Sequence, residues 1–246
     1  MPPLASVIVP VYNEGKLLPE VLRRLRGVQV PGASLEVIVV DDGSVDGSGE
    51  IAAAWQRQGA GTVIRHPVNR GKGAALQSGI AAALGEWVLI HDADLEYDSR
   101  DLPKLITPLQ QGTADVVYGN RMHRGNPVGY RRYWLGNYAI SLWASLLFGR
   151  RIHDVETGAK AFRRSVLVQL HLAAERFDIE VELTARTLQG GWRFTEVPIR
   201  YSPRRFGEGK KISWRDGVQA FWLLLRYRLE KPQTPNPKPQ TNSKFQ

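Results

Sequence analysis

The first half of this chain alternates short β-branched runs with segments of helical periodicity, and that alternation restricts the folds open to it. The runs expected to form strands are residues 6–11, 36–40, 61–65, 87–91 and 115–119. The segments expected to form helices are residues 17–26, 47–58, 74–84 and 102–110. Repeated strand-helix units of this kind build a mainly parallel central sheet flanked by helices. The sequence therefore predicts the α/β fold class.

The second half of the chain differs from the first in composition and in the order of its predicted elements. A basic, aromatic segment at residues 121–151 contains an apolar, helix-like stretch at residues 138–148. We expect a helix at about residues 179–188, a short strand at residues 193–200 and a C-terminal amphipathic helix at residues 214–229. The tail beyond that helix is rich in Pro, Gln, Asn and Thr with almost no apolar residues, so it is predicted to be disordered.

Polar or glycine-rich turns follow four of the predicted strands, at residues 13–14, 41–44, 69–73 and 92–94. Ligands of parallel sheets bind at the carboxyl ends of the strands. Tyr12, Glu14 and Asp41 could therefore converge on a base and a ribose, because carboxylates accept hydrogen bonds from both. The alternative is a pair of ordinary turns, with Ser44 and Asp46 acting as helix caps.

The tripeptide Asp92-Ala93-Asp94 directly follows an apolar run. Residues two apart in an extended segment point to the same side, so both carboxylates can face one small, hard cation. A lone Asp-x-Asp is common on protein surfaces, but here it follows a predicted strand, as the other polar turns do. This pattern indicates a site for a metal ion and a diphosphate.

Residues 69–75 combine two glycines, Lys72 and the start of a predicted helix. Backbone N-H groups and the helix dipole at such a point favour a bound anion. The segment is neither a Walker A loop nor a full dinucleotide fingerprint, and a plain capped turn explains it equally well. The prediction of an anion site at this segment therefore depends on the other polar turns that are expected at the same edge of the sheet.

The composition narrows the classes of partner. Lys and Arg number 33 against 24 Asp and Glu, and the resulting charge of +9 favours nucleotides, phosphates, nucleic acid or acidic lipid headgroups, or is merely a soluble basic surface. The chain has no cysteine, which excludes disulfides, thiolate metal sites and cysteine nucleophiles. No stretch approaches the roughly 20 apolar residues of a membrane-spanning helix, and no signal-type segment precedes the first strand. We therefore expect neither a transmembrane segment nor export.

Eight short stretches occur together in one order and spacing: residues 7–14, 39–44, 69–73, 92–94, 119–121, 154–158, 177–180, and Arg204 with residues 207–210. Through them the chain, from residue 6 to about residue 211, resembles family 2 glycosyltransferases with the GT-A fold. The resemblance is to the dolichyl-phosphate mannose or glucose synthase branch and its bacterial polyprenyl-phosphate relatives. It implies one GT-A domain over residues 1–230 and a disordered tail at residues 231–246.

The resemblance implies a donor half at about residues 1–120, with Mg²⁺ or Mn²⁺ bridging the diphosphate of the sugar nucleotide. The metal would be held by Asp92, Asp94 and Glu96, where Glu96 stands at a position that is often glutamine in this branch. Arg204 and Lys210 resemble the basic loop that closes over the donor phosphates. The residues expected to contact the donor are Pro10, Tyr12, Glu14, Asp41, Asp42, Lys72, Asp92, Ala93, Arg204 and Lys210.

The acceptor half, at about residues 121–230, is expected to face the membrane. Arg121 and either Arg131 or Arg132 match the family's acceptor-phosphate arginines, whose guanidinium forks suit phosphate oxygens. Asp178 and Glu180 open a predicted helix and are candidates for orienting the acceptor or the sugar, although a helix N-terminus favours acidic residues for structural reasons alone. The expected catalytic set is Asp94, Arg121, Arg132, Asp178 and Glu180.

The two apolar helices of this half carry Trp143, Trp214, Trp222 and Tyr227 beside arginines, a composition suited to a membrane interface or, equally, to a core. We therefore expect an inverting, metal-dependent transferase that moves glucose or mannose from UDP-glucose or GDP-mannose to a polyprenyl or dolichyl monophosphate. It would act as a peripheral protein on the cytoplasmic face of an anionic membrane. One alternative is a family 2 enzyme with a saccharide hydroxyl as acceptor, and another is a basic protein that binds nucleic acid or membrane surfaces. No recognition helix or interleaved stacking motif supports nucleic acid as a partner.

Overall fold

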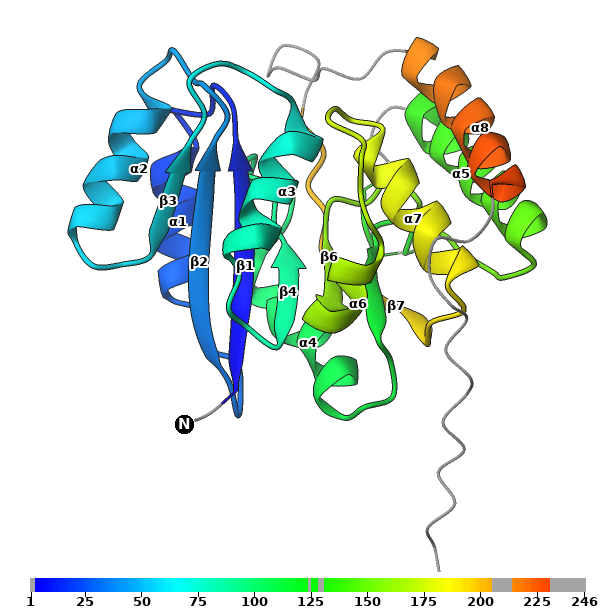
Figure 1. The fold of residues 1–246 in the computed structure, drawn as a ribbon, viewed down its shortest axis with the longest axis horizontal. Helices are drawn as coiled ribbons and strands as arrows, with labels where there is room; N and C mark the ends of the chain where they lie inside the picture. Colours follow the sequence, from blue (N-terminus) through cyan, green and yellow to red (C-terminus); the bar gives the residue numbers. More distant parts are fainter. Residues whose placement is uncertain (1–2, 124, 128–130, 205–213, 231–246) are drawn as a thin grey trace, which may run out of the picture.

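A computed structural model describes residues 3–123, 125–127, 131–204 and 214–230, without the side chains of residues 131–133 and 214–216. Its centre is a seven-stranded sheet in the order β3-β2-β1-β4-β6-β5-β7 (Figure 1). β6 runs antiparallel to both of its neighbours, and every other pair of adjacent strands is parallel. The strands are β1 Leu4–Val11, β2 Ser34–Asp41, β3 Thr62–Arg65, β4 Trp87–Ile90, β5 Val116–Asn120, β6 Lys160–Arg163 and β7 Phe194–Pro198.

Helices cover both faces of this sheet (Figure 1). One face is covered by α1 Leu18–Arg26, α2 Ser48–Arg57 and α4 Leu102–Gln110, which the short 3-10 turn η1 Ser99–Asp101 precedes. The other face is covered by α3 Lys72–Ala82, α5 Arg131–Phe148, α6 Arg164–Gln169, α7 Ile179–Gln189 and α8 Trp214–Leu229. α5 and α8 lie side by side at one end of this layer (Figure 1).

The parallel strands are buried on both sides, which is why they read as nearly continuous apolar runs. Along β1 the side chains alternate between the two cores: Val7 and Val9 pack with α1 and α2, whereas Ile8 packs with α3. Gly79 of α3 lies against Ile8, and a Cβ at that position would collide with the isoleucine side chain. The close approach of α3 to the sheet depends on this glycine, and it positions the start of α3 beside the strand ends.

The expected fold class is confirmed, with a mainly parallel sheet and helices on both faces. The expected helices at residues 102–110 and 214–229 coincide with α4 and α8. The pattern missed β6 and α6, because β6 is four residues long and carries a charged residue at each end, Lys160 and Arg163. The predicted disordered tail lies outside the described residues.

The conformation expected for Asp92-Ala93-Asp94 was wrong. β4 ends at Ile90, and Ala93 and Asp94 lie in a turn that continues into Leu95, whose φ is +59°. The two aspartates are therefore not alternate residues of an extended segment, and their carboxylates have different neighbours. Among the helices that the structure describes, none combines the length and the apolar character needed to cross a membrane.

Candidate active site

The turn that follows β1 is held in place by side chains that follow β2. The backbone N-H of Asn13 donates to Ser44 Oγ at 3.0 Å, and that of Glu14 donates to Ser48 Oγ at 2.9 Å. Gly15 N-H donates to Asp46 Oδ2 at 2.8 Å. The N-cap of α2 is Gly47, which offers no side chain, and Asp46 Oδ1 instead accepts the first helical N-H, that of Ser48, at 3.1 Å, while Asp46 Oδ2 and Ser44 hold the neighbouring turn. These bonds fix the position of Tyr12 and Glu14 at the carboxyl edge of the sheet.

Asp41 and Asp42 are both buried and have different roles. Asp41 Oδ1 accepts from the N-H of Ser44 at 3.0 Å, and its Oδ2 lies 3.2 Å from Nε of the half-exposed Arg65. Asp42 accepts from the backbone N-H groups of Arg70 at 3.0 Å and Gly71 at 2.7 Å, and its Oδ1 lies 2.6 Å from Nδ1 of His66. The carboxylate of Asp42 thus builds the turn that leads into α3.

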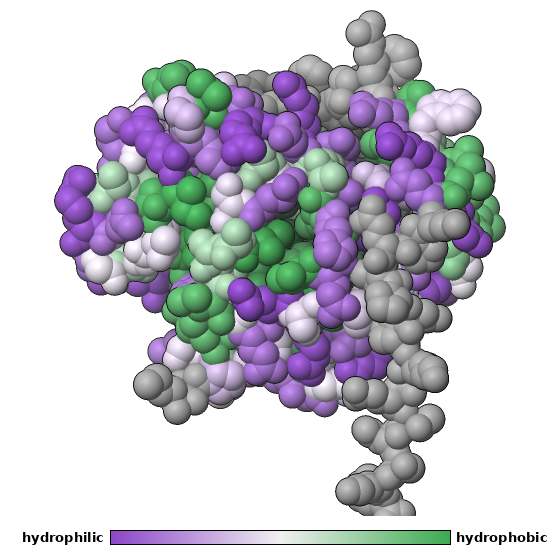
Figure 2. Space-filling view, viewed as in Figure 1, coloured by the Kyte–Doolittle hydropathy of each residue, from purple (hydrophilic) through white to green (hydrophobic). Residues whose placement is uncertain are grey.

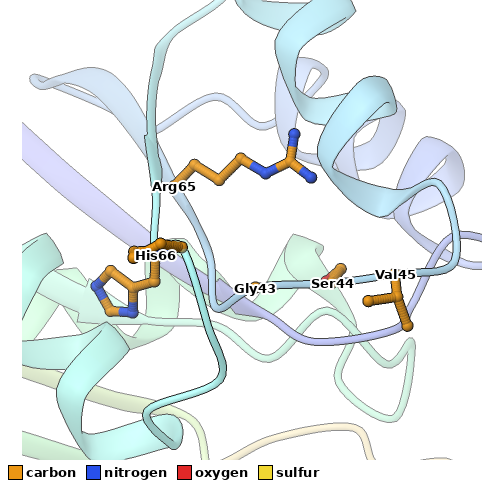
Figure 3. Close-up of a pocket in the computed structure, with 6 residues that line it drawn as sticks. Gly43, Ser44, Val45, Arg65 and His66 are labelled. Atoms are coloured by element: carbon orange, nitrogen blue, oxygen red, sulfur yellow. The ribbon is translucent and has the colours of Figure 1, made fainter.

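A cavity of about 440 Å³ opens between the ends of β2 and β3. Its lining residues are Gly43, Ser44, Val45, Arg65, His66 and Pro67 (Figure 3). Figure 3 shows the Arg65 guanidinium above the 43–45 segment, on the side where α2 begins. The Arg65 side chain lines the cavity and is held by the buried Asp41, so a flat, polar ring placed there would meet an oriented guanidinium.

A chain of charged side chains joins the start of α3 to α7. Lys72 Nζ lies 2.7 Å from Asp92 Oδ1 and 2.8 Å from Glu180 Oε1. The other oxygen of Glu180 is bound by the ammonium of Lys160, which is fully buried and also donates to the carbonyls of Val155 at 3.2 Å and Thr157 at 2.7 Å. One carboxylate, that of Glu180, therefore connects the strand-end lysine to the loop before β6.

The electrostatics of this chain follow from its burial. Burial opposes the charge on Lys72, but Asp92 and Glu180 outweigh it and raise the Lys72 pKa. Burial would likewise raise the pKa of Glu180, yet Lys160 and Lys72 hold it below its ordinary value. Both groups therefore stay charged at neutral pH, and Lys72 is a fixed cation beside Asp92.

Arg204 forms the second charged bridge. Its Nη2 lies 3.0 Å from Glu14 Oε1 and 3.6 Å from Asp94 Oδ2, and its Nε donates to the Asp94 carbonyl at 3.1 Å. The guanidinium thus joins the end of β1 to the turn after β4. The Glu96 carboxylate accepts from the Arg204 backbone N-H at 3.0 Å and from the Tyr201 hydroxyl at 2.9 Å. Glu96 therefore anchors the segment that carries Arg204.

Arg121, at the end of β5, is held by a buried carboxylate. Its Nε and Nη2 donate to Asp154 at 2.8 and 2.7 Å, and its backbone N-H donates to the same carboxylate at 2.9 Å. Asn137 of α5 donates to Asp154 at 2.8 Å, and the Arg121 guanidinium lies 5.2 Å from the centre of the Tyr201 ring. The bidentate pair fixes the orientation of Arg121 within the site.

The sequence did not indicate Glu156 as a site residue, although it lies in the motif stretch at residues 154–158. It belongs to the loop before β6, between Asp154 and Lys160. Burial, together with the neighbouring Glu180 carboxylate, raises the pKa of Glu156 to about 7. A carboxyl group with such a pKa can exchange a proton at neutral pH. Asp178 instead accepts from the backbone N-H of Arg176 at 3.1 Å, just ahead of α7.

The structure thus brings together the predicted residues Glu14, Asp94 and Arg204 in one group and Lys72, Asp92 and Glu180 in another. Arg131 and Arg132 begin α5, but their side chains lie outside the described part of the chain, as does all of Lys210. Lys160 and Asp154 also belong to the site, although the sequence did not predict either of them as a site residue. Lys160 is the first residue of the four-residue strand β6, and no spacing pattern predicted that strand.

The expected metal ligands do not form one cluster of three. Across residues 3–123, 125–127, 131–204 and 214–230, no group of three His, Cys, Asp or Glu residues is arranged to hold a metal ion. Asp92 and Asp94 are nevertheless hard oxygen donors at the site's edge, with side chains 19% and 22% exposed. One or two carboxylates suffice for Mg²⁺ when a diphosphate supplies further oxygens, so the two aspartates fit such an ion.

A mainly parallel sheet with carboxylates and fixed cations at its carboxyl edge is suited to a phosphorylated ligand bound at that edge. The model of glycosyl transferase family 2 matches residues 6–170, and the chain belongs to that family. It is a glycosyltransferase, as the resemblance of its motifs implied.

Relatives and solved structures agree with this assignment. The chain is 33% identical to the undecaprenyl-phosphate mannosyltransferase of Micrococcus luteus, over 90% of this chain and 97% of the relative. It is 30% identical to glycosyltransferase AglJ of Haloferax volcanii, over 95% of this chain and 74% of the relative. Glucosyl-3-phosphoglycerate synthase of Mycobacterium tuberculosis, solved with Mn²⁺, UDP-glucose and phosphoglyceric acid, superposes with a TM-score of 0.71 at 23% identity, over 92% of this chain and 80% of that one. This last likeness establishes the fold alone.

Proposed function

We propose that the enzyme transfers a hexose, glucose or mannose, from UDP-glucose or GDP-mannose to a polyprenyl or dolichyl monophosphate, with inversion at the anomeric carbon. The observation that carries the proposal is the pairing of Asp92 with Lys72 and of Asp94 with Arg204 at one edge of the sheet. The acceptor class rests on the undecaprenyl-phosphate mannosyltransferase and on the undecaprenyl-phosphate 4-deoxy-4-formamido-L-arabinose transferase of Salmonella paratyphi A, which is 29% identical over 83% of this chain and 62% of that protein.

On the donor side, the cavity beside Arg65 and Asp41 would take the nucleobase, with Pro10, Tyr12 and Glu14 along the ribose. Lys72 and Arg204 supply fixed positive charge for the diphosphate, because each is already held by carboxylates and loses little freedom on binding. Glu96 contributes by anchoring the Arg204 segment, whose backbone it binds. We include Lys210 in this loop on the strength of the sequence motif.

Asp92 and Asp94 would hold a Mg²⁺ or Mn²⁺ ion together with the donor phosphates. Such an ion stabilises the negative charge that develops on the departing nucleoside diphosphate. Lys72 lies 2.7 Å from Asp92 and Arg204 lies 3.6 Å from Asp94, so both cations are held beside the carboxylates that would bind the ion and could contact the donor phosphates.

On the acceptor side, Arg121, with Arg131 or Arg132, would bind the lipid phosphate and direct one of its oxygens at the anomeric carbon. That oxygen forms the new bond to the sugar, and the bond from the sugar to the nucleoside diphosphate breaks. A phosphate monoester is largely ionised at neutral pH, so the attacking oxygen needs no separate base. Asp154 keeps Arg121 aimed, because it binds two nitrogens of the guanidinium.

A second acceptor class, a saccharide hydroxyl, is favoured by one observation. Such a nucleophile must lose a proton, and Glu156 has a pKa of about 7 that suits a general base. Glu180 and Asp178 are less suited to that role, since Glu180 is tied to two lysines and Asp178 to the backbone ahead of α7. Under this second function the Glu156→Gln variant would lose nearly all activity.

The deciding experiment incubates the purified full chain with UDP-glucose or GDP-mannose, Mg²⁺ and a short-chain polyprenyl phosphate, and detects the product by mass spectrometry. Formation of a sugar-phosphate-polyprenyl product supports the proposal. A parallel reaction with oligosaccharide acceptors tests the second function. Absence of a glycolipid with every donor, while a saccharide product forms, would reject the lipid acceptor.

A further inference from the structure

Tyr201 lies between the two arginines that the proposed function assigns to the donor and to the acceptor. It follows the end of β7 by three residues, and its side chain is partly buried. The hydroxyl donates to Glu96 Oε2 at 2.9 Å, and the ring centre lies 5.2 Å from the guanidinium carbon of Arg121. One side chain therefore contacts both the carboxylate that anchors the Arg204 segment and the arginine assigned to the acceptor.

On the donor side, Glu96 uses both of its carboxylate oxygens for the segment that carries Arg204. Oε2 accepts from the Tyr201 hydroxyl, and Oε1 accepts from the Arg204 backbone N-H at 3.0 Å. The Glu96 carbonyl also accepts from the Ser202 N-H at 2.9 Å. A hydroxyl bound to a carboxylate makes one of the stronger hydrogen bonds in proteins. Without that bond the carboxylate could rotate away from the Arg204 N-H, so the place of this arginine beside Asp94 depends on Tyr201.

On the acceptor side, Arg121 meets the Tyr201 ring. The distance of 5.2 Å is within the roughly 6 Å at which an aromatic face attracts a cation. The Arg121 side chain is only 15% exposed, so water screens this attraction little. Asp154 binds two nitrogens of the same guanidinium. The ring adds a second restraint on Arg121 without neutralising its charge.

Tyr201 is itself held in place. Its backbone N-H donates to Asn126 Oδ1 at 3.1 Å, and Asn126 Nδ2 donates to the Arg121 carbonyl at 3.0 Å. Tyr97 pairs with Tyr201 in an isolated antiparallel bridge, and their ring centres are 5.8 Å apart. The Tyr97 hydroxyl accepts from the Gly158 N-H at 2.7 Å. A residue that positions others needs such support, because its own movement would pass to its partners.

We propose that Tyr201 is a positioning residue that sets the placement of Arg204 and Arg121 relative to each other, and its acceptor half rests on the proposed lipid-phosphate acceptor. The reaction joins an acceptor oxygen to the anomeric carbon of the donor, so its rate depends on how the two substrates are aligned. Tyr201 acts through Glu96 on the donor side and directly on Arg121 on the acceptor side.

Two substitutions of Tyr201 separate its contacts. Tyr201→Phe removes the hydroxyl and keeps the ring. It should raise the Kd of the full chain for UDP or GDP with Mn²⁺, measured by calorimetry, by about three- to tenfold. Its KM for a short-chain polyprenyl phosphate should stay within about twofold of the wild type. Tyr201→Leu removes both contacts, so it should raise the same Kd to a similar extent, raise the acceptor KM by about fivefold or more and lower kcat.

The matched control is Tyr227, which makes the same kind of contact away from the strand ends. Its ring centre lies 4.8 Å from the Arg186 guanidinium, near the C-terminal end of α8. Figure 1 places α8 at the right-hand edge of the molecule, where Figure 2 shows hydrophobic surface. Tyr227→Phe and Tyr227→Leu should leave the Kd and KM within about twofold, even where they lower the melting temperature as much as the Tyr201 variants do.

The outcomes separate this proposal from the proposed function. An unchanged Kd for the nucleoside diphosphate in both Tyr201 variants, or a wild type that binds neither UDP nor GDP, would overturn the positioning role whichever acceptor the enzyme uses. An acceptor KM of Tyr201→Leu equal to that of the wild type would overturn the acceptor half.

A wild type that transfers nothing to a polyprenyl phosphate would reject the proposed acceptor, and the NMR signal of the Arg121 Nε-H would then decide the contact with the ring. Asp154 binds this N-H, which slows its exchange with water. The ring current of residue 201 should shift the signal in the wild type and in Tyr201→Phe but not in Tyr201→Leu. The same signal position in all three proteins would overturn the restraint of Arg121 by Tyr201.

Discussion

Glu180→Gln tests whether the buried charge chain is essential for the site's architecture. The substitution keeps the shape of the side chain but removes its charge, and it leaves the ammonium groups of Lys72 and Lys160 facing a neutral amide. Breaking a buried ion pair by removing one partner costs about 3 to 5 kcal/mol. Lys72 retains Asp92 at 2.7 Å, so we expect the lower end, about 3 kcal/mol.

For a chain of this size, each kcal/mol lowers the melting temperature by about 2 to 4 °C, so Glu180→Gln should lower it by about 6 to 12 °C. The matched control is Glu50→Gln, the same chemical change on a side chain that is 70% exposed, and we expect it to lie within about 0.5 kcal/mol of the wild type. Scanning calorimetry or circular dichroism measures both variants.

The pH dependence has a defined sign. The folded-state pKa of Glu180 lies below its ordinary value of 4.5, so its contribution to stability is present above that pH and is lost as the pH falls further. The difference between wild type and Glu180→Gln should therefore be full at neutral pH and shrink below pH 4.5. A difference that grows on acidification would contradict the charged state assigned to this residue.

A double variant tests whether Lys160 and Glu180 interact. Lys160→Met combined with Glu180→Gln removes both members of the buried pair, so the double variant should be more stable than the sum of the two single effects predicts. Strict additivity, or a Glu180→Gln melting temperature equal to that of Glu50→Gln, would refute the interaction inferred among Lys72, Glu180 and Lys160. The Michaelis constant for the donor should also rise in Glu180→Gln, because Lys72 loses one of its two carboxylates.

Three further predictions concern the metal, the pH response and the start of α3. Asp94→Ala should abolish the Mn²⁺-dependent thermal shift produced by a nucleoside diphosphate, whereas Glu50→Gln should retain it; an unchanged shift in Asp94→Ala would exclude Asp94 as a ligand. Glu156 has a folded-state pKa raised from 4.5 to about 7, so its stabilising effect is complete below pH 4.5 and disappears as the pH rises through about 7. The difference in melting temperature between wild type and Glu156→Gln should follow that course, and a flat difference across this range would show that the group is not perturbed. Gly73→Ala places a methyl group against the Ala174 carbonyl and should destabilise the protein by about 1 to 3 kcal/mol, while Gly217→Ala, in open space on α8, should be neutral or slightly stabilising in the same denaturation assay.

The sequence predicted the positions of polar residues best where they directly follow a strand with a clear apolar pattern. The polar residues after β1, β2 and β4 could be located because a parallel sheet places all of these ends on one edge. The partners within that edge could not be predicted, since they depend on side-chain distances. Asp42 shows the difference: it follows β2 like Asp41, yet its carboxylate is used by the backbone of residues 70–71.

Lys160 and the outer face of α5 show the two other limits of the pattern. A lysine in a four-residue strand resembles a surface charge, and only the fold shows that it is fully buried against Glu180. The apolar residues of α5 were equally compatible with a core and an interface, because composition alone does not say which side of a helix is covered. The exposed fractions decided between these readings for Trp143 and Trp222.

The reversed direction of β6 separates the two halves of the site along the chain. β6 pairs antiparallel with β4, with Lys160 opposite Ile90, so this strand starts at the edge where β1, β2 and β4 end. The donor-side residues therefore follow their strands, whereas Asp154 and Glu156 precede theirs. The loop residues that hold Arg121 can therefore change without altering the sequence of any donor-side turn, while the end of the loop contacts that side, where the Gly158 N-H donates to the Tyr97 hydroxyl at 2.7 Å. A family built on this plan can exchange one acceptor for another while its sugar-nucleotide chemistry stays the same.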